Sequence, residues 1–220
     1  MCGIIGYVGA KPAAPIILDG LRRLEYRGYD SAGLAVILDG TLQSHKKKGK
    51  IDEGLARLLR ERPLAGSFGI GHTRWATHGP PSDENSHPHP DQSGRLALVH
   101  NGVIENFEQL KQRYLKAGHV FHSSTDTEVL AHLVGDHYQR LKGVSTENHP
   151  LAQAVINALP EVIGTYGIAV ISVDHPGVIV GARRGSPLIL GVGQGENLLA
   201  SDASAIVAHT RQVVYLNDYE

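Results

Sequence analysis

The sequence predicts an α+β fold in which helices pack outside two stacked, largely antiparallel sheets. Two observations carry this prediction. Short apolar runs rich in β-formers lie at both ends of the chain, and segments with helical spacing of apolar residues lie between them. Near the C-terminal end, successive apolar runs are separated only by short turn sequences, which is typical of antiparallel strands. With 220 residues and 41% hydrophobic content, we expect one domain over 1–220.

The N-terminal quarter is predicted to contain a strand, a helix and a hairpin. Residues 3–9 are apolar with glycine at both ends, and residues 12–26 follow with a proline at the helix start and apolar residues at helical spacing. Residues 33–38 and 41–45 flank Asp39-Gly40, a dipeptide typical of tight hairpin turns. The first strand fixes the position of Cys2, which precedes it directly.

The middle of the chain combines two further strands, a long loop and two helices. Strands are expected at 67–75 and 95–103, and the stretch 79–94 between them is rich in Pro, His, Ser and Asn and is expected to be irregular. A loop of this length is more often functional than idle. Helices are expected after Asn106 and Thr125, because each is followed by Gln or Glu three residues on, as in a capping box.

The last third changes to strand patterns after one more helix. That helix is expected at 151–159, ending at Pro160. The apolar runs that follow are expected to form an antiparallel meander: 165–173, 177–183, 187–192 and 197–200. A final strand is expected near 213–216, four residues before the sequence stops, so we expect a piece of a longer protein.

Composition excludes several classes of function. The 21 Lys and Arg residues nearly balance the 22 Asp and Glu residues, so no global field favours nucleic acid or an anionic membrane. No apolar run approaches the roughly 20 residues of a membrane helix, and the first residues lack the pattern of a signal peptide. The single cysteine cannot form an internal disulfide, which fits a reducing compartment. We therefore expect a cytoplasmic protein.

Cys2 is the first candidate for chemistry. A thiolate is the reactive form of cysteine, and an ordinary thiol is only a few per cent ionised at neutral pH, so the thiol needs a base. If Met1 is removed, the freed α-amine of Cys2, with a pKa of about 7.7–8.0, can accept the thiol proton. On position alone, the alternative that Cys2 is merely a small residue permitting Met1 removal is equally well supported.

Three other segments could carry a site. His100-Asn101-Gly102 ends a predicted strand and could supply an amide and a backbone N–H to an oxyanion, although a plain turn explains it too. Arg74 lies in the segment 71–79, where a predicted strand enters the long loop, and a guanidinium suits a carboxylate. Asp126 opens a predicted helix, where an acidic residue also simply complements the helix dipole.

Zinc binding is a rival hypothesis, because five histidines lie within thirty residues. They are His72, His78, His87, His89 and His100. The spacing is unfavourable, since there is no HExxH and no second cysteine, and prolines separate two of the histidines. Phosphate-binding, dinucleotide-binding and serine-hydrolase motifs do not occur either. We expect no metal and no cofactor.

Taken together, seven ordered segments resemble the class II, N-terminal nucleophile glutamine amidotransferases, most closely the glutaminase domains of the branch that aminates fructose 6-phosphate. The segments are CGIIGY (2–7), LEYRGYDSAG (24–33), GHTRWATHG (71–79), NSHPH (85–89), HNGVIENF (100–107), STDTE (124–128) and GTYGIAVI (164–171). They cover most of the chain and are highly specific. A phosphoribosyl pyrophosphate amidotransferase remains the alternative within the same class, but such proteins usually have another residue in place of Tyr29 and a different run after Asn101-Gly102.

The resemblance implies a four-layer αββα sandwich and a cysteine-dependent glutaminase. It implies that Cys2 attacks the glutamine amide while the Asn101 side chain and Gly102 N–H hold the oxyanion. Glutamine would be bound or its pocket supported by Arg74, Thr77, His78, Asp126, Arg27 and Trp75, the last in a mobile loop. It also implies that ammonia passes to a sugar-phosphate isomerase half, absent from this sequence, which makes glucosamine 6-phosphate. The whole enzyme would be a homo-oligomer.

Two departures bear on activity. Met1 is present in the sequence, and while it remains it acylates the Cys2 amine and removes the expected base. The sequence also stops slightly before such a glutaminase domain usually ends. A second hypothesis therefore stands beside the enzyme: a binding or regulatory module that retains the glutamine pocket but performs no chemistry.

Overall fold

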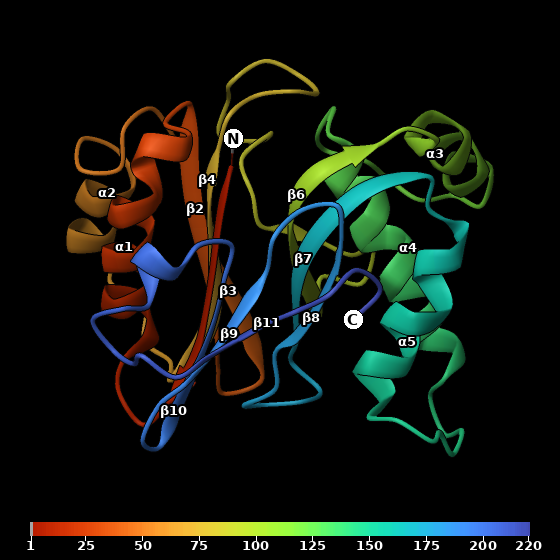
Figure 1. The fold of residues 1–220 in the computed structure, drawn as a ribbon. Helices are drawn as coiled ribbons and strands as arrows, with labels where there is room; N and C mark the ends of the chain where they lie inside the picture. Colours follow the sequence, from red (N-terminus) through yellow and green to blue (C-terminus); the bar gives the residue numbers. More distant parts are fainter. Residues whose placement is uncertain (1) are drawn as a thin grey trace.

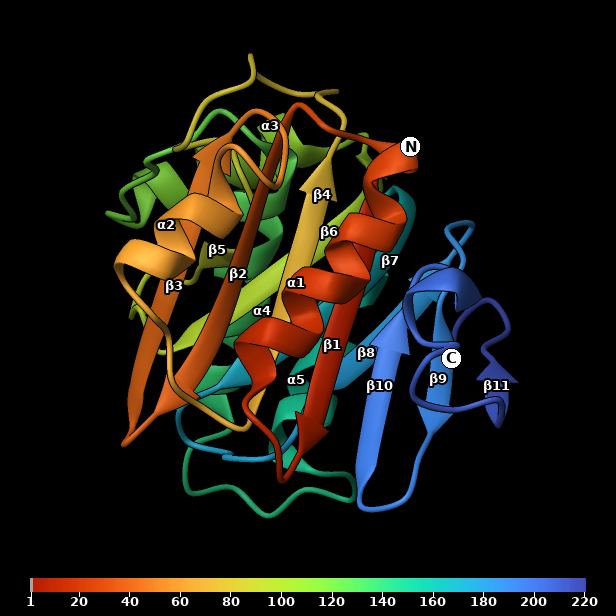
Figure 2. The same ribbon diagram turned by 90° about the vertical axis from the view of Figure 1, so that its left-hand side faces the viewer.

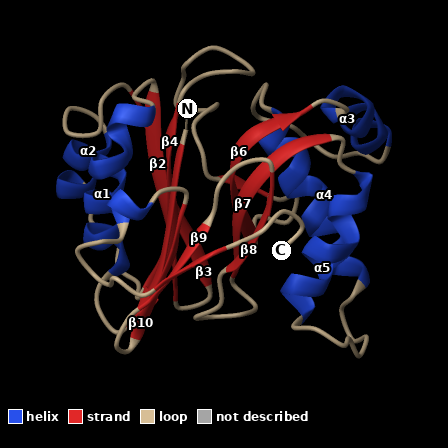
Figure 3. Ribbon diagram, in the orientation of Figure 1, coloured by secondary structure: helices blue, strands red, loops and turns tan. Residues whose placement is uncertain are grey.

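The fold consists of two antiparallel sheets stacked face to face, with helices on the outer side of each (Figures 1 and 3). It is seen in a computed structural model that describes residues 2–220. The predicted α+β class and the four-layer αββα arrangement are confirmed. Met1, on whose removal the expected base depends, lies outside the described residues.

The larger sheet has seven strands. They are β1 (Gly3–Gly9), β2 (Ser31–Leu38), β3 (Thr41–Lys48), β4 (Phe68–Arg74), β9 (Ile189–Val192), β10 (Glu196–Ala200) and β11 (Val213–Tyr215). Their order is β11-β9-β10-β1-β4-β2-β3, with every neighbouring pair antiparallel. Helices α1 (Ala13–Leu24) and α2 (Leu55–Glu61) cover the outer face of this sheet (Figure 2).

The smaller sheet has four strands and carries the remaining helices on its outer face. The strands are β5 (His89–Pro90), β6 (Leu96–Ile104), β7 (Gly164–Ser172) and β8 (Val180–Arg184), in the order β5-β6-β7-β8. The helices are α3 (Phe107–Lys116), α4 (Asp126–Arg140) and α5 (Pro150–Ala158). Short 3₁₀ turns lie at Glu25–Arg27, Leu159–Glu161 and Ala203–Ala205.

Apolar side chains fill three interior spaces between the four layers. One cluster, with Ile17 and Leu21, joins α1 to the large sheet, and another, with Leu98 and Leu133, joins the small sheet to its helices. The third lies between the sheets and includes Ile70 of β4. Each fully buried Leu or Ile contributes about 1.5–3 kcal/mol. This packing fixes the two sheets relative to each other, and the candidate site lies between them.

Most predicted elements are confirmed to within a few residues. The predicted hairpin turn is confirmed at Asp39 and Gly40, which have φ angles of 49° and 70°, as this kind of turn requires. The helix at 55–61 was not predicted, since its few apolar positions gave no clear period. The stretch 79–94 is irregular except for the two residues of β5.

Two predictions are wrong in detail. Asn106 precedes α3 but its side chain does not cap the helix; it bonds instead to the Glu161 carbonyl and the Ile163 N–H. The four last apolar runs do not form a single meander, because β8 pairs in the small sheet while β9 and β10 pair in the large one. The chain crosses between sheets after Arg184. Pairing partners are chosen by tertiary packing, which the runs themselves do not encode.

Within residues 2–220, no helix combines the length and apolar character needed to cross a bilayer.

Candidate functional site

Cys2 lies at the start of β1, beside the end of β4. Antiparallel pairing of Gly3 with Thr73 brings the thiol next to Trp75, 73 residues later in the chain. The Trp75 N–H donates to Cys2 Sγ at 3.2 Å, and Sγ lies 3.5 Å from the Trp75 carbonyl oxygen. The sheet register therefore fixes the thiol beside the end of β4.

Burial raises the pKa of the Cys2 thiol above its ordinary value. The hydrogen bond from the Trp75 backbone and the nearby Arg74 charge act in the opposite direction but do not outweigh burial. The thiol is therefore mostly protonated near neutral pH. A reaction through its thiolate requires a proton acceptor close to the sulfur.

Asn101 and Gly102 lie on β6, across from Cys2. The Asn101 Nδ2 donates to the Cys2 carbonyl at 3.3 Å, and its Oδ1 lies 3.0 Å from His72 Nε2. Gly102 has a φ of 135°, which side chains rarely adopt. A Cβ on Gly102 would lie 2.2 Å from the Thr165 carbonyl oxygen. Only glycine therefore fits at position 102. With glycine, the backbone can adopt this positive φ, which sets the direction of the Gly102 N–H.

Asp126 is the first residue of α4, and the carboxylate is almost fully buried. The preceding Thr125 caps the helix by accepting the Glu128 N–H at 3.2 Å, as the sequence predicts. One carboxylate oxygen of Asp126, Oδ2, accepts the Ile104 N–H at 2.9 Å. The same oxygen lies 3.7 Å from His78 Nδ1. Helix, strand and loop thus meet at this carboxylate.

Arg74 binds the loop that follows β4 through hydrogen bonds to its backbone. The guanidinium donates to the backbone carbonyls of His78, of Gly79 at 3.2 Å and of Pro80 at 3.4 Å. Trp75 is 46% exposed, and its ring packs edge-on against Tyr29 with centroids 5.6 Å apart. The loop therefore folds back over the thiol.

These groups enclose a small cavity. Its lining residues are Cys2, Arg74, Trp75, Thr77, His87, His100, Gly102, Asp126 and Thr127. The space open to the centre of a water molecule is about 10 Å³, which corresponds to roughly one water. An amino acid as large as glutamine enters only if the loop around Trp75 moves.

All nine residues singled out from the sequence lie in or next to this cavity. Six of the nine line it, Asn101 bonds to Cys2, and His78 lies beside Asp126. Arg27 donates through Nε to the Cys2 carbonyl at 3.3 Å, and its Nη1 lies 2.9 Å from Asp202 Oδ2.

Sequence reasoning missed the residues that support this set. Asp202 pairs with Arg27 from 175 residues away, and Asp30 Oδ2 accepts the Ala76 N–H at 2.8 Å. From the sequence, His72 stands out only as one of five clustered histidines. No local sequence pattern predicts these contacts. Asp30 and His72 do lie in two of the seven segments that resemble the family, 24–33 and 71–79.

Three of the clustered histidines, His72, His87 and His89, pack their rings against one another in the interior. Rings of His72 and His87 lie 4.1 Å apart, and burial lowers the pKa of each, that of His72 to about 3. Among residues 2–220, no three His, Cys, Asp or Glu side chains are grouped as ligands for one ion.

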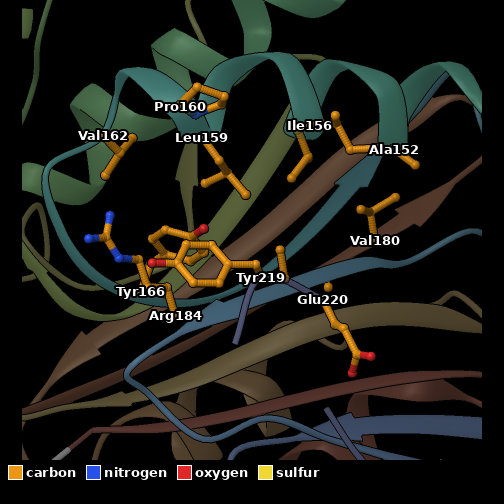
Figure 4. Close-up of a pocket in the computed structure, with 13 residues that line it drawn as sticks. Ala152, Ile156, Leu159, Pro160, Val162, Tyr166, Val180, Arg184, Tyr219 and Glu220 are labelled. Atoms are coloured by element: carbon orange, nitrogen blue, oxygen red, sulfur yellow. The ribbon is translucent and has the colours of Figure 1, made fainter. Parts of the chain in front are cut away.

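A much larger cavity, of about 610 Å³, lies elsewhere. It is a mostly apolar groove between α5, β8 and the last residues, with Ile156, Val180 and Tyr219 in its walls (Figure 4). The described residues that line it include no Cys, Ser, Thr, Lys or His side chain. Size therefore does not identify the reactive site in this protein.

The comparisons with known proteins agree with the geometry. Residues 61–145 match the family model described as a glutamine amidotransferase domain. The fold is also that of solved amidotransferases: the glutamine phosphoribosylpyrophosphate amidotransferase from B. subtilis superposes with a TM-score of 0.77 at 31% identity, covering 100% of this chain and 45% of that one. A protein described as a glutamine aminotransferase class-II domain protein, from Silicibacter pomeroyi, shares the fold alone, with a TM-score of 0.59 at 15% identity, covering 99% of this chain and 92% of that one.

The chain belongs to the glutamine amidotransferase family. Over its whole length it is similar to glutamine–fructose-6-phosphate aminotransferases (isomerizing), with 50% identity to that of Aquifex aeolicus and 52% to that of Chlorobaculum tepidum. The chain spans 36% and 35% of the length of those two proteins. This is a family of enzymes.

Proposed function

We propose that the chain hydrolyses the side-chain amide of glutamine, with the Cys2 thiol as nucleophile. The observation that carries the proposal is the convergence of one thiol, one amide, one glycine backbone and one buried carboxylate on a single cavity. The family membership supports the same reaction.

The reaction divides into attack and hydrolysis. The Cys2 sulfur attacks the amide carbon, and the oxyanion is held by the Asn101 amide and the Gly102 N–H. Each such donor contributes roughly 3–4 kcal/mol to the transition state. Ammonia leaves with the proton taken from the thiol, and water then cleaves the γ-glutamyl thioester to give glutamate. The proton acceptor is the α-amine of Cys2, which exists only after Met1 is removed.

The amino-acid end of glutamine is bound by charge. We assign the α-ammonium to the buried carboxylate of Asp126, which lines the cavity and whose Oδ2 accepts the Ile104 N–H. The α-carboxylate is assigned to Arg74, with Thr77 and His78. The loop around Trp75 then closes over the substrate, and Arg27 holds the Cys2 carbonyl.

The acceptor of the ammonia is proposed from the relatives. Their identity of about 50% over the whole chain favours fructose 6-phosphate, and glucosamine 6-phosphate as product. The 31% identity to a phosphoribosylpyrophosphate amidotransferase structure keeps that reaction as the second candidate. On this proposal residues 1–220 are the glutaminase domain of a longer, homo-oligomeric cytoplasmic enzyme, and the sugar phosphate binds to another part.

Glutamate release from glutamine tests the proposal. The protein is prepared without Met1, as shown by its intact mass, and compared with Cys2→Ala. Release that disappears in Cys2→Ala supports a cysteine glutaminase. Glutamine binding without release, in protein confirmed to lack Met1, contradicts the enzyme and favours the binding module.

A further inference from the structure

His72 is a fully buried imidazole between the sheets, bonded to the side chain that we propose as an oxyanion donor. It lies on β4 of the large sheet, and its Nε2 is 3.0 Å from Asn101 Oδ1 on β6 of the small sheet. The bond therefore crosses from one sheet to the other. It is shorter than the bond from the Asn101 amide nitrogen to the Cys2 carbonyl, which measures 3.3 Å.

The chemistry of the two partners fixes where the proton lies. A carbonyl oxygen only accepts, so His72 Nε2 must carry the hydrogen in this bond. Burial lowers the pKa of His72 to about 3, so the ring is neutral near pH 7 and has a single N–H. Its Nδ1 is then a bare lone pair, in agreement with the lack of any hydrogen-bond partner for this atom among residues 2–220.

The same bond decides which way the Asn101 amide faces. With Oδ1 toward the His72 N–H, the NH₂ group faces the Cys2 carbonyl, which is an acceptor. The flipped amide would set its carbonyl oxygen against the Cys2 carbonyl oxygen. It could still bond to His72 only if the ring took the other tautomer, with a bare Nε2 and a buried N–H at Nδ1 that has no partner among residues 2–220. The flip therefore loses the bond to Cys2 and buries an unpartnered N–H, each at a cost of about 1 kcal/mol or more.

We propose that His72 is a positioning residue that holds the Asn101 amide with its NH₂ group toward the reacting carbon. This inference rests on the proposed glutaminase activity. His72 itself does not touch the substrate. Because the oxyanion exists only in the transition state, loss of the His72 bond lowers kcat and leaves KM nearly unchanged.

Three substitutions of His72 separate positioning from packing. His72→Phe fills the space without an N–H, and we expect kcat to fall by about 10- to 100-fold with KM within about 3-fold. His72→Gln places an amide N–H₂ near the position of Nε2 and should recover most of kcat. His72→Asn places its amide near Nδ1 instead and should not. Equal kcat in all three variants would overturn the proposal.

His132→Phe is the matched control. His132 is equally buried, on α4, and bonds to His119 away from the cavity. The variant should lose stability as His72→Phe does but retain kcat. A similar fall of kcat in both variants would indicate a general effect of losing a buried imidazole.

A double-mutant cycle with Asn101→Ala tests whether His72 acts through Asn101. Once the amide is removed, His72→Phe should have no further effect on kcat, so the two effects are strongly non-additive. Additive effects would contradict the proposal, since a residue that merely stabilises the fold would act in either background.

Nitrogen-15 NMR gives a readout that does not depend on activity. Wild-type protein near pH 7 should show His72 as the neutral tautomer protonated at Nε2, and one slowly rotating Asn101 side-chain amide that becomes mobile in His72→Phe. A proton on Nδ1, or an Asn101 amide unchanged in the variant, would overturn the positioning role. A wild-type protein that releases no glutamate would overturn the proposed function instead, while NMR would still decide the His72–Asn101 bond.

Discussion

Mild acid should destabilise this protein through its buried histidines before its carboxylates are protonated. His72 has a pKa of about 3 in the folded chain because it is fully buried, against about 6.5 in an unfolded chain. Burial also lowers the pKa of His87, His89 and His100. Between pH 6.5 and 3 the unfolded state therefore binds more protons than the folded state, and the free energy of unfolding falls as the pH falls.

The magnitude for His72 follows from its two pKa values. Below pH 6.5, each pH unit lowers the free energy of unfolding by about 1.36 kcal/mol for this one histidine. Lowering the pH from 7.5 to 5 includes about 1.5 such units and therefore reduces the free energy of unfolding by about 2 kcal/mol. Near pH 3, where folded His72 is itself protonated, the loss of unfolding free energy due to this residue reaches its maximum of about 5 kcal/mol. Carboxylates with lowered pKa values, such as Glu161 and Asp174, lose their contribution mainly below pH 4.5, so pH 5 isolates the histidines.

Urea unfolding at pH 7.5 and pH 5 measures the effect. The wild-type protein should lose more than 2 kcal/mol between the two pH values, since several histidines contribute. His72→Phe should be less stable at pH 7.5 but should lose about 2 kcal/mol less on acidification. If both proteins lose the same amount, His72 does not remain neutral in the folded state and the argument from its burial fails.

Three substitutions test the site directly. Cys2→Ser should reduce glutamate release by at least about 1,000-fold while the melting temperature stays within a few degrees; measurable release near the wild-type rate would remove Cys2 from the mechanism. Gly102→Ala places a Cβ 2.2 Å from the Thr165 oxygen, so both the melting temperature and the rate should fall, and a protein of normal stability would show that the backbone relaxes there. Asp126→Asn keeps an oxygen for the Ile104 N–H but loses its charge, so KM for glutamine should rise about 10- to 100-fold; an unchanged KM would contradict the assigned role.

The sequence alone determined the fold class and most of the elements. Apolar periods, the Asp39-Gly40 turn and the Thr125 cap are local signals, since each depends on residues only a few positions apart. The order of strands, the crossing after Arg184 and the failed cap at Asn106 depend on distant partners. Local patterns cannot specify these partners.

For the candidate site too, the sequence predicts some features and the tertiary structure decides others. The sequence pointed to Cys2, Asn101 and Asp126 as residue types suited to the chemistry, and the resemblance assigned their roles. Only the tertiary structure set Asn101 between His72 and Cys2, because that arrangement requires two sheets to stack with β4 facing β6. The sequence specifies the identity of Asn101. The direction of its side chain depends on hydrogen bonds to His72 and Cys2, which packing brings next to it from other parts of the chain.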